Sequence, residues 1–404
     1  MDIGERAAGI QHRNAAFVLV WGVVVGIVSR RIGSLSGLSF VATTGLLGAY
    51  VGYPGLRKAH AATTCEVTST GDDDTAPYTP GELRYCLEQV NSAGVDAITF
   101  AAVTNGTSIS LNNDLPQVTV TSSLTITGNG DDSTVIDGQD PDNPDHGGLH
   151  FNGSGTGTVT VTGIKIQNTY RSSGGAIDID SGDLTVTDSS LDSNSADSDG
   201  GAINIAYGDL TVTGSNFDSN SAVSGDGGAI NIADGDLTVT DSSFTSNSAG
   251  KDNDGEGGAI RIIRGDHTVT GSDFSSNSAG DNGGAMSLSS DATLSVSNST
   301  FTNNRSGNEG GSGSSDGGAI NAGDVTISNS TFTGNAAVES DAEGGAIETS
   351  SGHVTVTDST FTSNTAGEFG GAIRSSDGDI TVSGSTFTTN SSADDGGVFD
   401  TNSG

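Results

Sequence analysis

The chain has little positive charge and few aromatic side chains. Its 404 residues include 14 Lys and Arg against 50 Asp and Glu, which gives a formal net charge of -36, and only 5% of the residues are aromatic. This balance disfavours nucleic acids and anionic membranes as partners, because both repel an acidic surface. It suits divalent cations, a high-salt environment or simple solubility, and composition does not separate these alternatives.

Apolar residues are also scarce, at 32% of the chain, whereas glycine is abundant, at 62 residues. On these figures alone the chain would be expected to stay disordered, because it offers little apolar surface to offset the entropy of folding. An internal repeat argues the other way. Gly-Gly pairs begin at positions 174, 200, 227, 257, 283, 317, 344, 370 and 396. A period of this length indicates a solenoid or a propeller.

Each copy of the repeat carries the same phrase. In the copy GGAINIADGDLTVTDSSFTSN, Gly227 and Gly228 open the phrase, Phe244 lies near its end, and Asn247 follows three residues later. The aromatic position is Leu in the first of eight copies and Phe in the others, and the Asn is present in all eight. Most variation in length falls between this Asn and the next Gly-Gly. We therefore expect insertions to lie along one edge of the structure.

Within each copy, apolar and polar residues alternate in short runs separated by Gly, Asp, Asn and Ser, which is typical of strands and turns. No helical stripe of useful length follows residue 95. Three short strands per copy predict a parallel β-helix of about nine or ten rungs, on the order of 45 Å long. We expect Phe244 and its equivalents to stack in a column, Gly227 and Gly228 to form a sharp corner, and Asn247 to bond along the axis inside a turn.

The first 61 residues differ from the rest. An apolar run is followed by SRR at positions 29–31, by a second apolar stretch and by AHA at 59–61. This order is typical of a twin-arginine export signal with a cleavage site, and a retained membrane anchor is the alternative. We expect residues 1–61 to be this segment, residues 62–173 an N-terminal cap with irregular first rungs, and residues 174–404 the regular β-helix. The expected location is extracellular, on the cell surface or at the outer membrane.

A short amphipathic helix is expected before the first rungs. TPGE at 79–82 is typical of a helix start with a capping box between Thr79 and Glu82, and Gly94 would end the helix. This helix is well placed to cover the open first rung. Cys65 and Cys86 lie just past the expected cleavage site, and in an exported protein they are expected to form one disulfide.

The paired motifs GGAI and FxxN resemble the repeat of the polymorphic outer membrane proteins, over about residues 174–397. The stretch from Cys65 to Phe100 is similar to the region that often precedes such β-helices. The resemblance implies a right-handed, pectin-lyase-like β-helix, export, surface display and adhesion. The chain stops at GGVFDTNSG, one corner into a new rung, so a fragment, a freely secreted form and a rod completed by a partner all stay open.

The function we expect is non-enzymatic adhesion or surface recognition, with a surface protein or glycan as the partner and no nucleic acid. The segments between Asn and Gly-Gly would form the recognition edge, because their length and sequence vary while the scaffold stays constant. The candidate binding residues on this edge are Arg305, Asn308, Glu309, Asp316, Lys251, Asp252 and Asp254.

No cofactor is required by any motif, and calcium is the alternative. Asp252, Asp254 and Glu256 concentrate oxygen ligands of the kind that hard cations prefer. They match neither an EF-hand nor the glycine-rich calcium repeat. Solvated acidic turns explain the same residues.

A carbohydrate-active β-helix, either a polysaccharide lyase or a hydrolase, is the alternative function. Such an enzyme needs clustered carboxylates, usually with Arg or Lys, on one outward face. Asp178 and Asp180 are the candidate catalytic pair, since both are expected to point outward from the strand after GGAI. Farther along that column, Glu348 and Arg374 would form a surface pair of little energetic value.

Two further features have ordinary explanations. The histidines at 146, 150, 267 and 353 are scattered, and we expect them to be surface residues. Outward Thr-x-Thr pairs such as Thr238 and Thr240 resemble the array of ice-binding solenoids. Thr is also a common exposed strand residue, which explains the array without ice or mineral binding.

Overall fold

The computed structural model describes residues 63–139, 146–153, 157–250, 254–308 and 315–401. Residues 61–404 form one compact unit. The expected export segment, residues 1–61, lies outside the described residues. Among the described residues, no helix has the length and apolar character needed to cross a bilayer.

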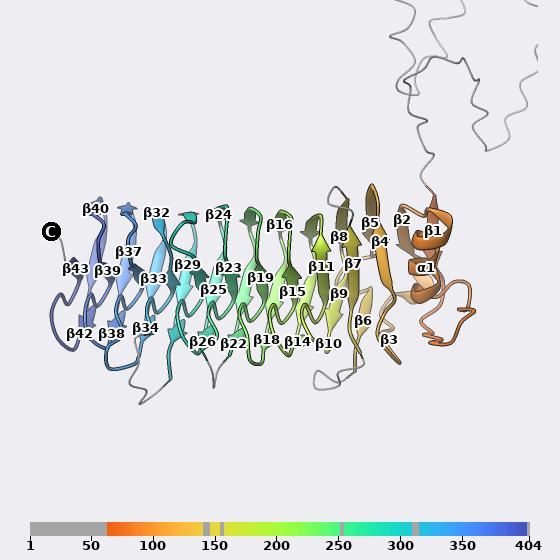
Figure 1. The fold of residues 1–404 in the computed structure, drawn as a ribbon, viewed down its shortest axis with the longest axis horizontal. Coiled ribbons are helices and arrows are strands. Elements are labelled where there is room, and N and C mark those ends of the chain that lie inside the picture. The colour runs from red at the N-terminus through yellow and green to blue at the C-terminus, as the bar shows by residue number, and fades with distance from the viewer. Residues whose placement is uncertain (1–62, 140–145, 154–156, 251–253, 309–314, 402–404) are drawn as a thin grey trace, which may run out of the picture. The chain divides into compact units, whose positions relative to one another are not determined.

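The described chain is a right-handed parallel β-helix in which strands of successive coils pair in parallel to build four long sheets (Figure 1). The sheet that carries the Thr-x-Thr pairs, here the Thr sheet, has 12 strands. They are β1 (Thr64–Val67), β2 (Ala97–Phe100), β5 (Ser123–Thr127), β8 (Thr158–Thr162), β12 (Asp183–Thr187), β16 (Leu210–Thr213), β20 (Leu237–Thr240), β24 (Asp266–Thr270), β28 (Thr293–Ser297), β32 (Asp324–Ser328), β36 (Val354–Thr357) and β40 (Ile380–Ser383).

The strands that follow Gly-Gly form the GGAI sheet, with 11 strands. They are β4 (Gln117–Val120), β7 (Leu149–Gly153), β11 (Ile177–Ser181), β15 (Ile203–Ile205), β19 (Ile230–Ile232), β23 (Ile260–Ile262), β27 (Met286–Leu288), β31 (Ile320–Asn321), β35 (Ile347–Thr349), β39 (Ile373–Ser375) and β43 (Phe399–Thr401).

The Phe sheet, which carries the aromatic position, also has 11 strands. They are β3 (Ile109–Ser110), β6 (Val135–Asp137), β9 (Lys165–Gln167), β13 (Ser190–Asp192), β17 (Asn216–Asp218), β21 (Ser243–Thr245), β25 (Asp273–Ser275), β29 (Thr300–Thr302), β33 (Thr331–Thr333), β37 (Thr360–Thr362) and β41 (Thr386–Thr388).

A fourth sheet, here the short sheet, follows the Asn position and has nine strands of two residues each. They are β10 (Tyr170–Arg171), β14 (Ser195–Ala196), β18 (Ser221–Ala222), β22 (Ser248–Ala249), β26 (Ser278–Ala279), β30 (Arg305–Ser306), β34 (Ala336–Ala337), β38 (Thr365–Ala366) and β42 (Ser391–Ser392). The prediction of three strands per coil was therefore wrong, because a two-residue strand is too short to show alternation. The prediction of nine or ten rungs was also too low, since the irregular first coils add strands to the Thr sheet.

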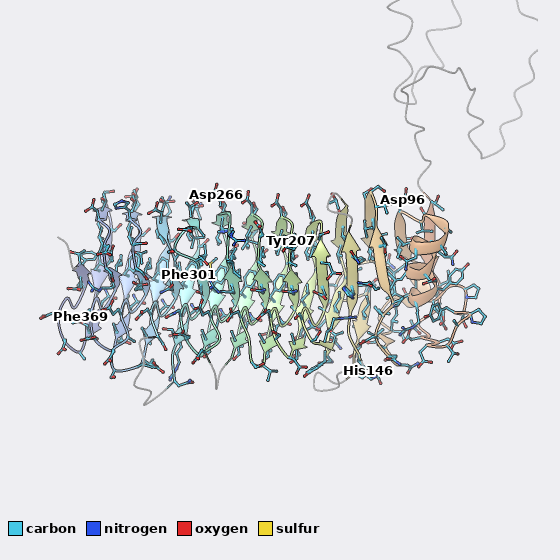
Figure 2. All side chains as sticks on the ribbon, viewed as in Figure 1. Asp96, His146, Tyr207, Asp266, Phe301 and Phe369 are labelled. Carbon is cyan, nitrogen blue, oxygen red and sulfur yellow. A yellow bond between two sulfur atoms is a disulfide. The ribbon has the colours of Figure 1, made fainter. Side chains whose placement is uncertain are left out.

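The core is a set of columns in which like side chains stack along the axis, as predicted. The rings of Phe244 and Phe274 have centroids 4.7 Å apart and planes 3° apart. Phe301, labelled in Figure 2, continues this column, in which each ring from Phe217 to Phe361 is fully buried. Burial of each such side chain contributes roughly 1.5 to 3 kcal/mol. A single coil could not bury these side chains, so stability comes from stacking.

The Asn column forms the predicted ladder. The side-chain amide of Asn247 donates to the backbone oxygen of Phe217 and to Oδ1 of Asn277, each at 3.0 Å. The backbone N–H of Asn247 donates to the same Oδ1 at 3.0 Å. Equivalent bonds join Asn194 through to Asn390, and these Asn residues are buried as far as Asn364. Each Asn therefore satisfies backbone groups in a buried corner, where unpaired groups would be costly.

The Gly-Gly corner is confirmed, and its two glycines are needed for different reasons. Gly227 has φ +65°, a backbone conformation that favours glycine. At Gly228, a Cβ atom would lie 2.1 Å from the backbone oxygen of Gly258, so no larger side chain fits between the coils. Sequence periodicity alone indicated a corner but not this division of roles.

The predicted capping helix is α1 (Leu83–Ala93), which packs against β1 and β4 at the start of the β-helix (Figure 1). A single turn of 3-10 helix, η2 (Ala102–Thr104), follows β2. Gly94 ends α1, as predicted, and its backbone adopts a left-handed conformation. The predicted capping box was wrong: among the described residues no side chain caps α1, and the Glu82 carboxylate instead accepts a hydrogen bond from Asp73 N at 2.8 Å. The predicted disulfide between Cys65 and Cys86 is present.

Candidate functional site

The outward side of the GGAI sheet carries a continuous polar column, here the polar column. Strand register places its members side by side on consecutive coils. They are Gln117, His150, Asp178, Asn204, Asn231, Arg261, Ser287, Asn321, Glu348, Arg374 and Asp400. Several are more buried than an outward strand position implies, because the residues directly before each Gly-Gly pack alongside them.

At the N-terminal end of the polar column, the structure brings Asp178 and Asp180 together with His150. Nε2 of His150 lies 3.5 Å from Oδ2 of Asp178 and 3.4 Å from Oδ2 of Asp180. The side chain of Gln117 reaches the same point, with its amide nitrogen 3.2 Å from His150 Nε2 and 3.3 Å from Asp180 Oδ2. The predicted pair is therefore part of a four-residue cluster, here the His150 cluster.

Two further side chains support this cluster from either side. Asn204 donates to Oδ1 of Asp178 at 3.0 Å, which leaves Oδ2 for His150. Arg171 donates to Gly148 O at 3.1 Å and places Nη1 3.5 Å from Nδ1 of His150. Burial raises the pKa of Asp178, and the Asn204 hydrogen bond and the charges of His150 and Arg171 partly oppose that rise. Asp178 is therefore a partly buried carboxyl group with the charges of His150, Arg171 and Asp180 around it.

The sequence analysis missed His150, Gln117 and Arg171. The signal for His150 was present, because Gly147-Gly148-Leu149-His150 precedes Gly174 by one period and places His150 in the polar column. The expectation that His150 is an ordinary surface residue was wrong for this reason. Gln117 and Arg171 lie on irregular coils whose register was not evident from the repeat.

The middle of the polar column is organised around Arg261. Its Nε lies 2.9 Å from Oε2 of Glu256 and 3.6 Å from Oδ2 of Asp226. Ser287 also donates to Oε2 of Glu256, at 2.9 Å. Of the three calcium candidates, Glu256 is thus engaged by an arginine and a serine, Asp254 is exposed, and Asp252 lies outside the described residues. Burial together with the charges of Glu256, Asp254 and Glu339 raises the pKa of nearby Asp281 to about 6.

The C-terminal part of the polar column holds the most strongly perturbed carboxyl groups. Burial raises the pKa of Glu348 to about 8 and that of Asp316 to about 7, and neighbouring carboxylates add to both shifts. The expected surface pair of Glu348 with Arg374 was wrong, since both side chains are buried. Glu348 accepts a hydrogen bond from Asn321 at 2.7 Å, while Arg374 pairs with Glu343 at 2.9 Å and with Asp400.

The predicted recognition edge is only partly described. Arg305, in β30, donates from Nε to Gly307 O at 3.3 Å, and Asn308 N donates to Glu339 Oε1 at 3.3 Å. Asp316 belongs to the acidic group beside Glu348. The remaining candidates Lys251 and Glu309 lie outside the described residues. Arg305 and Asn308 are thus hydrogen-bonded to other residues of the edge.

The expectation that His267 is a surface residue was also wrong. It is 2% exposed and occupies the inward position that Leu237 and Leu294 hold on the adjacent coils. Its Nδ1 accepts a hydrogen bond from Leu237 N at 3.1 Å, and its Nε2 has no partner among the described residues. Burial lowers the pKa of His267 to about 4, so the ring is neutral at pH 7.

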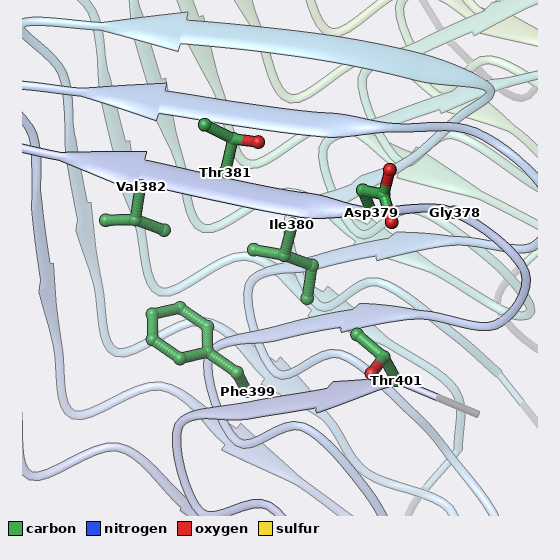
Figure 3. A pocket seen from close by; sticks show the side chains of 7 residues that line it. All are labelled: Gly378, Asp379, Ile380, Thr381, Val382, Phe399 and Thr401. Carbon is green, nitrogen blue, oxygen red and sulfur yellow. The ribbon is translucent and has the colours of Figure 1, made fainter. Parts of the chain in front are cut away.

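A pocket of about 560 Å³ opens at the last described coils (Figure 3). Ile380, Val382 and Phe399 line it with the side chains that equivalent positions of earlier coils bury in the core. Among the described residues that line it, Asp379 is the one carboxylate. The pocket therefore continues the apolar core and lacks the converging polar groups of the His150 cluster.

Comparison with a protein-family model supports the fold. A family model described as the right-handed beta helix region matches residues 229–404. Among solved structures, the chain is similar to the Agl-KA catalytic domain, with 14% identity and a TM-score of 0.45, over 85% of this chain and 69% of that one. A likeness at that level carries no argument about function. No curated protein matches the chain.

Proposed function

We propose that the chain is an exported, non-enzymatic β-helix protein that recognises a surface protein or glycan, in keeping with its resemblance to polymorphic outer membrane repeats. The observation that supports this proposal is the contrast between scaffold and edge. The scaffold repeats with residues in register, whereas 5 to 12 residues separate each Asn from the next Gly-Gly. Variable segments on a constant support are typical of recognition surfaces.

The edge also differs from the scaffold in what it presents to solvent. Val223, in the segment after Asn220, is 52% exposed, whereas the inward residues of the neighbouring coils are fully buried. The longest segment, between Asn304 and Gly317, contains the candidate residues Arg305, Asn308 and Asp316. We place the main contact with the partner on this segment.

A binding assay with a shortened edge tests the proposal. Deletion of residues 309–314 leaves a segment close in length to the five residues between Asn277 and Gly283, which the scaffold already accommodates. Labelled full-length protein is expected to bind cell-envelope material or host cells, and the deletion is expected to weaken that binding at least tenfold. Shortening the segment between Asn247 and Gly257 to five residues tests the second part of the edge, which carries Lys251, Asp252 and Asp254. Equal binding by all three proteins, with unchanged circular dichroism, would rule out the edge as the recognition surface.

Export is a separate part of the proposal and has its own test. Replacement of Arg30 and Arg31 by Lys is expected to retain the protein inside the producing cell, because twin-arginine export depends on that pair. Fractionation of cells that express the two forms measures this. Unchanged secretion of the variant contradicts the proposed route.

A carbohydrate-active enzyme is the second candidate, and the His150 cluster is the observation that favours it. Paired carboxylates beside a histidine and an arginine can supply acid-base chemistry at a glycosidic bond. Tyr207, 63% exposed and labelled in Figure 2, lies one coil from the turn at Gly182 and could stack on a sugar ring. A reducing-sugar and unsaturated-product assay on a polyuronate panel tests this candidate. If the wild-type chain releases no product, the enzyme candidate is ruled out. Activity that persists in the double variant Asp178→Asn, Asp180→Asn also rules out the His150 cluster as its active site.

A further inference from the structure

We propose that the His150 cluster is a binding site for one divalent transition-metal ion of the zinc class. The four side chains come from three consecutive strands of the GGAI sheet, with Gln117 on β4, His150 on β7, and Asp178 and Asp180 on β11. The ligand atoms of His150, Asp178 and Asp180 all lie within 4.8 Å of one another. The site goes beyond the proposed recognition function and does not depend on it.

The spacing of the polar atoms fits a tetrahedral metal site. Zinc binds His nitrogen and carboxylate oxygen at about 2.0 to 2.2 Å, so two ligand atoms of a tetrahedron stand roughly 3.3 to 3.6 Å apart. The contacts from His150 Nε2 to the two aspartate oxygens are 3.5 and 3.4 Å, and the contacts from the Gln117 carboxamide are 3.2 and 3.3 Å. These separations are long for hydrogen bonds between charged groups but match four of the six edges of such a tetrahedron.

Without an ion, Nε2–H of His150 can donate to the two aspartates while Nδ1 faces Arg171. The same side chains can also turn their lone pairs to one point. If Nε2 were unprotonated, its lone pair would face two carboxylates. The oxygen and nitrogen of a glutamine carboxamide are interchangeable by rotation, so Gln117 can present Oε1 to the same point. A cation at that point accepts lone pairs from all four groups at once.

The surroundings suit the bound ion. Asn204 holds Oδ1 of Asp178 and leaves Oδ2 available, which is how outer groups commonly orient a ligating carboxylate. Arg171 is held by Gly148 O with Nη1 3.5 Å from Nδ1 of His150, so its charge opposes a bound cation and the two aspartates have to outweigh it. The side chain of Asp180 is 49% exposed, so the site is open to solvent on one side. An ion can therefore enter from solvent without opening the coil.

The donor set selects the kind of ion. An imidazole nitrogen with two carboxylates and a carboxamide suits Zn²⁺ and neighbouring first-row divalent ions. Ca²⁺ requires six to eight oxygen ligands, and Mg²⁺ prefers an octahedral, largely hydrated shell. We therefore expect discrimination in favour of Zn²⁺ over Ca²⁺, in contrast to the calcium that is the alternative to solvated acidic turns at 252–256.

The experiment uses the full-length protein, stripped with a chelator and titrated with Zn²⁺ in 150 mM salt with millimolar Ca²⁺ and Mg²⁺ to occupy non-specific acidic sites. Calorimetry is expected to show one Zn²⁺ per chain. The same titration with Co²⁺ is expected to give the intense visible absorption of a tetrahedral site. His150→Gln is expected to weaken Zn²⁺ binding at least 100-fold, and Asp180→Asn at least tenfold.

His353 supplies the matched control, because it lies 3.8 Å from Asp379 in an exposed pair and belongs to no such group of ligands among the described residues. His353→Gln is expected to leave Zn²⁺ affinity unchanged. If His150→Gln fails to fold by circular dichroism, the exposed Asp180→Asn variant still decides the matter. No stoichiometric Zn²⁺ in the wild-type chain, or equal affinity in the His150, Asp180 and His353 variants, overturns the proposal.

Discussion

Nε of Arg374 lies 2.9 Å from Oε2 of Glu343, although strand register places Arg374 directly beside Glu348. Arg374 is buried, so this pairing neutralises a charge that water cannot reach. The ring of Phe369 lies 5.5 Å from the same guanidinium. Glu343, the residue directly before Gly344, thus balances a charge of the polar column on the next coil. Four predictions follow from this and related buried polar groups.

Replacement of Arg374 by Gln is expected to lower the free energy of unfolding by about 3 to 5 kcal/mol, because it leaves the partly buried carboxylates of Glu343 and Asp400 without their cation. Chemical denaturation at pH 7 measures the loss. Arg264→Gln is the matched control, since Arg264 is 70% exposed and its pair with Asp234 spans 3.7 Å. The control is expected to change stability by less than about 1 kcal/mol. A similar change in both variants contradicts a special role for Arg374.

The raised pKa values of Glu348 and Asp316 predict that stability falls as pH rises. Each group holds its proton more tightly in the folded state than in the unfolded chain, so the folded state binds more protons between about pH 4 and pH 8. The stability from this difference is present below pH 4 and is lost as pH rises through 7 and 8. Glu348→Gln is expected to flatten that decline and to stabilise the protein by about 1 to 3 kcal/mol at pH 8. Thermal unfolding at pH 5 and pH 8 measures both effects, with Asp379→Asn as an exposed control.

The lowered pKa of His267 predicts the opposite slope at acidic pH. The unfolded chain takes up a proton near pH 6.5, whereas the folded state does so only near pH 4. Stability contributed by this group is therefore lost as pH falls from 6.5 to 4. His267→Leu is expected to remove that loss, because leucine fills the same position on both adjacent coils. Unfolding midpoints at pH 4.5 and 7 measure the change, and a variant as acid-sensitive as the wild type would refute it.

The Asn ladder predicts that removal of one side-chain amide lowers the stability of the fold substantially. Asn277→Ala is expected to destabilise the fold by about 2 to 4 kcal/mol, since it removes the hydrogen bonds to Phe244 O and from Asn247 N in a buried corner. Asn216 lies on an exposed strand position, and Asn216→Ala is expected to cost less than about 0.5 kcal/mol. Urea unfolding of the two variants measures the difference. Equal values would show that the ladder does not stabilise the corner.

The repeat made much of the fold predictable. Identical spacing from Gly to Phe and from Phe to Asn means that stacked coils bring like residues together, and the columns of Phe244 and Asn247 are where this places them. Cys65 and Cys86 were predictable because no other cysteines exist. The short sheet was missed because strands of two residues have no detectable period.

The candidate site was harder to predict. Asp178 and Asp180 were found because alternation shows which residues point outward from a strand. Gln117 comes from a coil whose spacing departs from the regular repeat, whereas Asn204 lies on a regular coil and the Gly-Gly at 147 could have identified His150. His267 could likewise have been recognised as inward by its alignment with Leu237 and Leu294. Burial of the polar column was not predictable, since it depends on the path of the turn before each Gly-Gly.

By itself, the sequence determined the period, the direction in which strand residues face and the columns that form the core. These properties are local and repeat in every coil, so they can be predicted without knowing which side chains of different coils are in contact. Only the tertiary structure decided which charged groups meet. Pairs such as Arg374 with Glu343, and His150 with Asp178, join residues on different coils, and their distances depend on how each turn packs against the polar column.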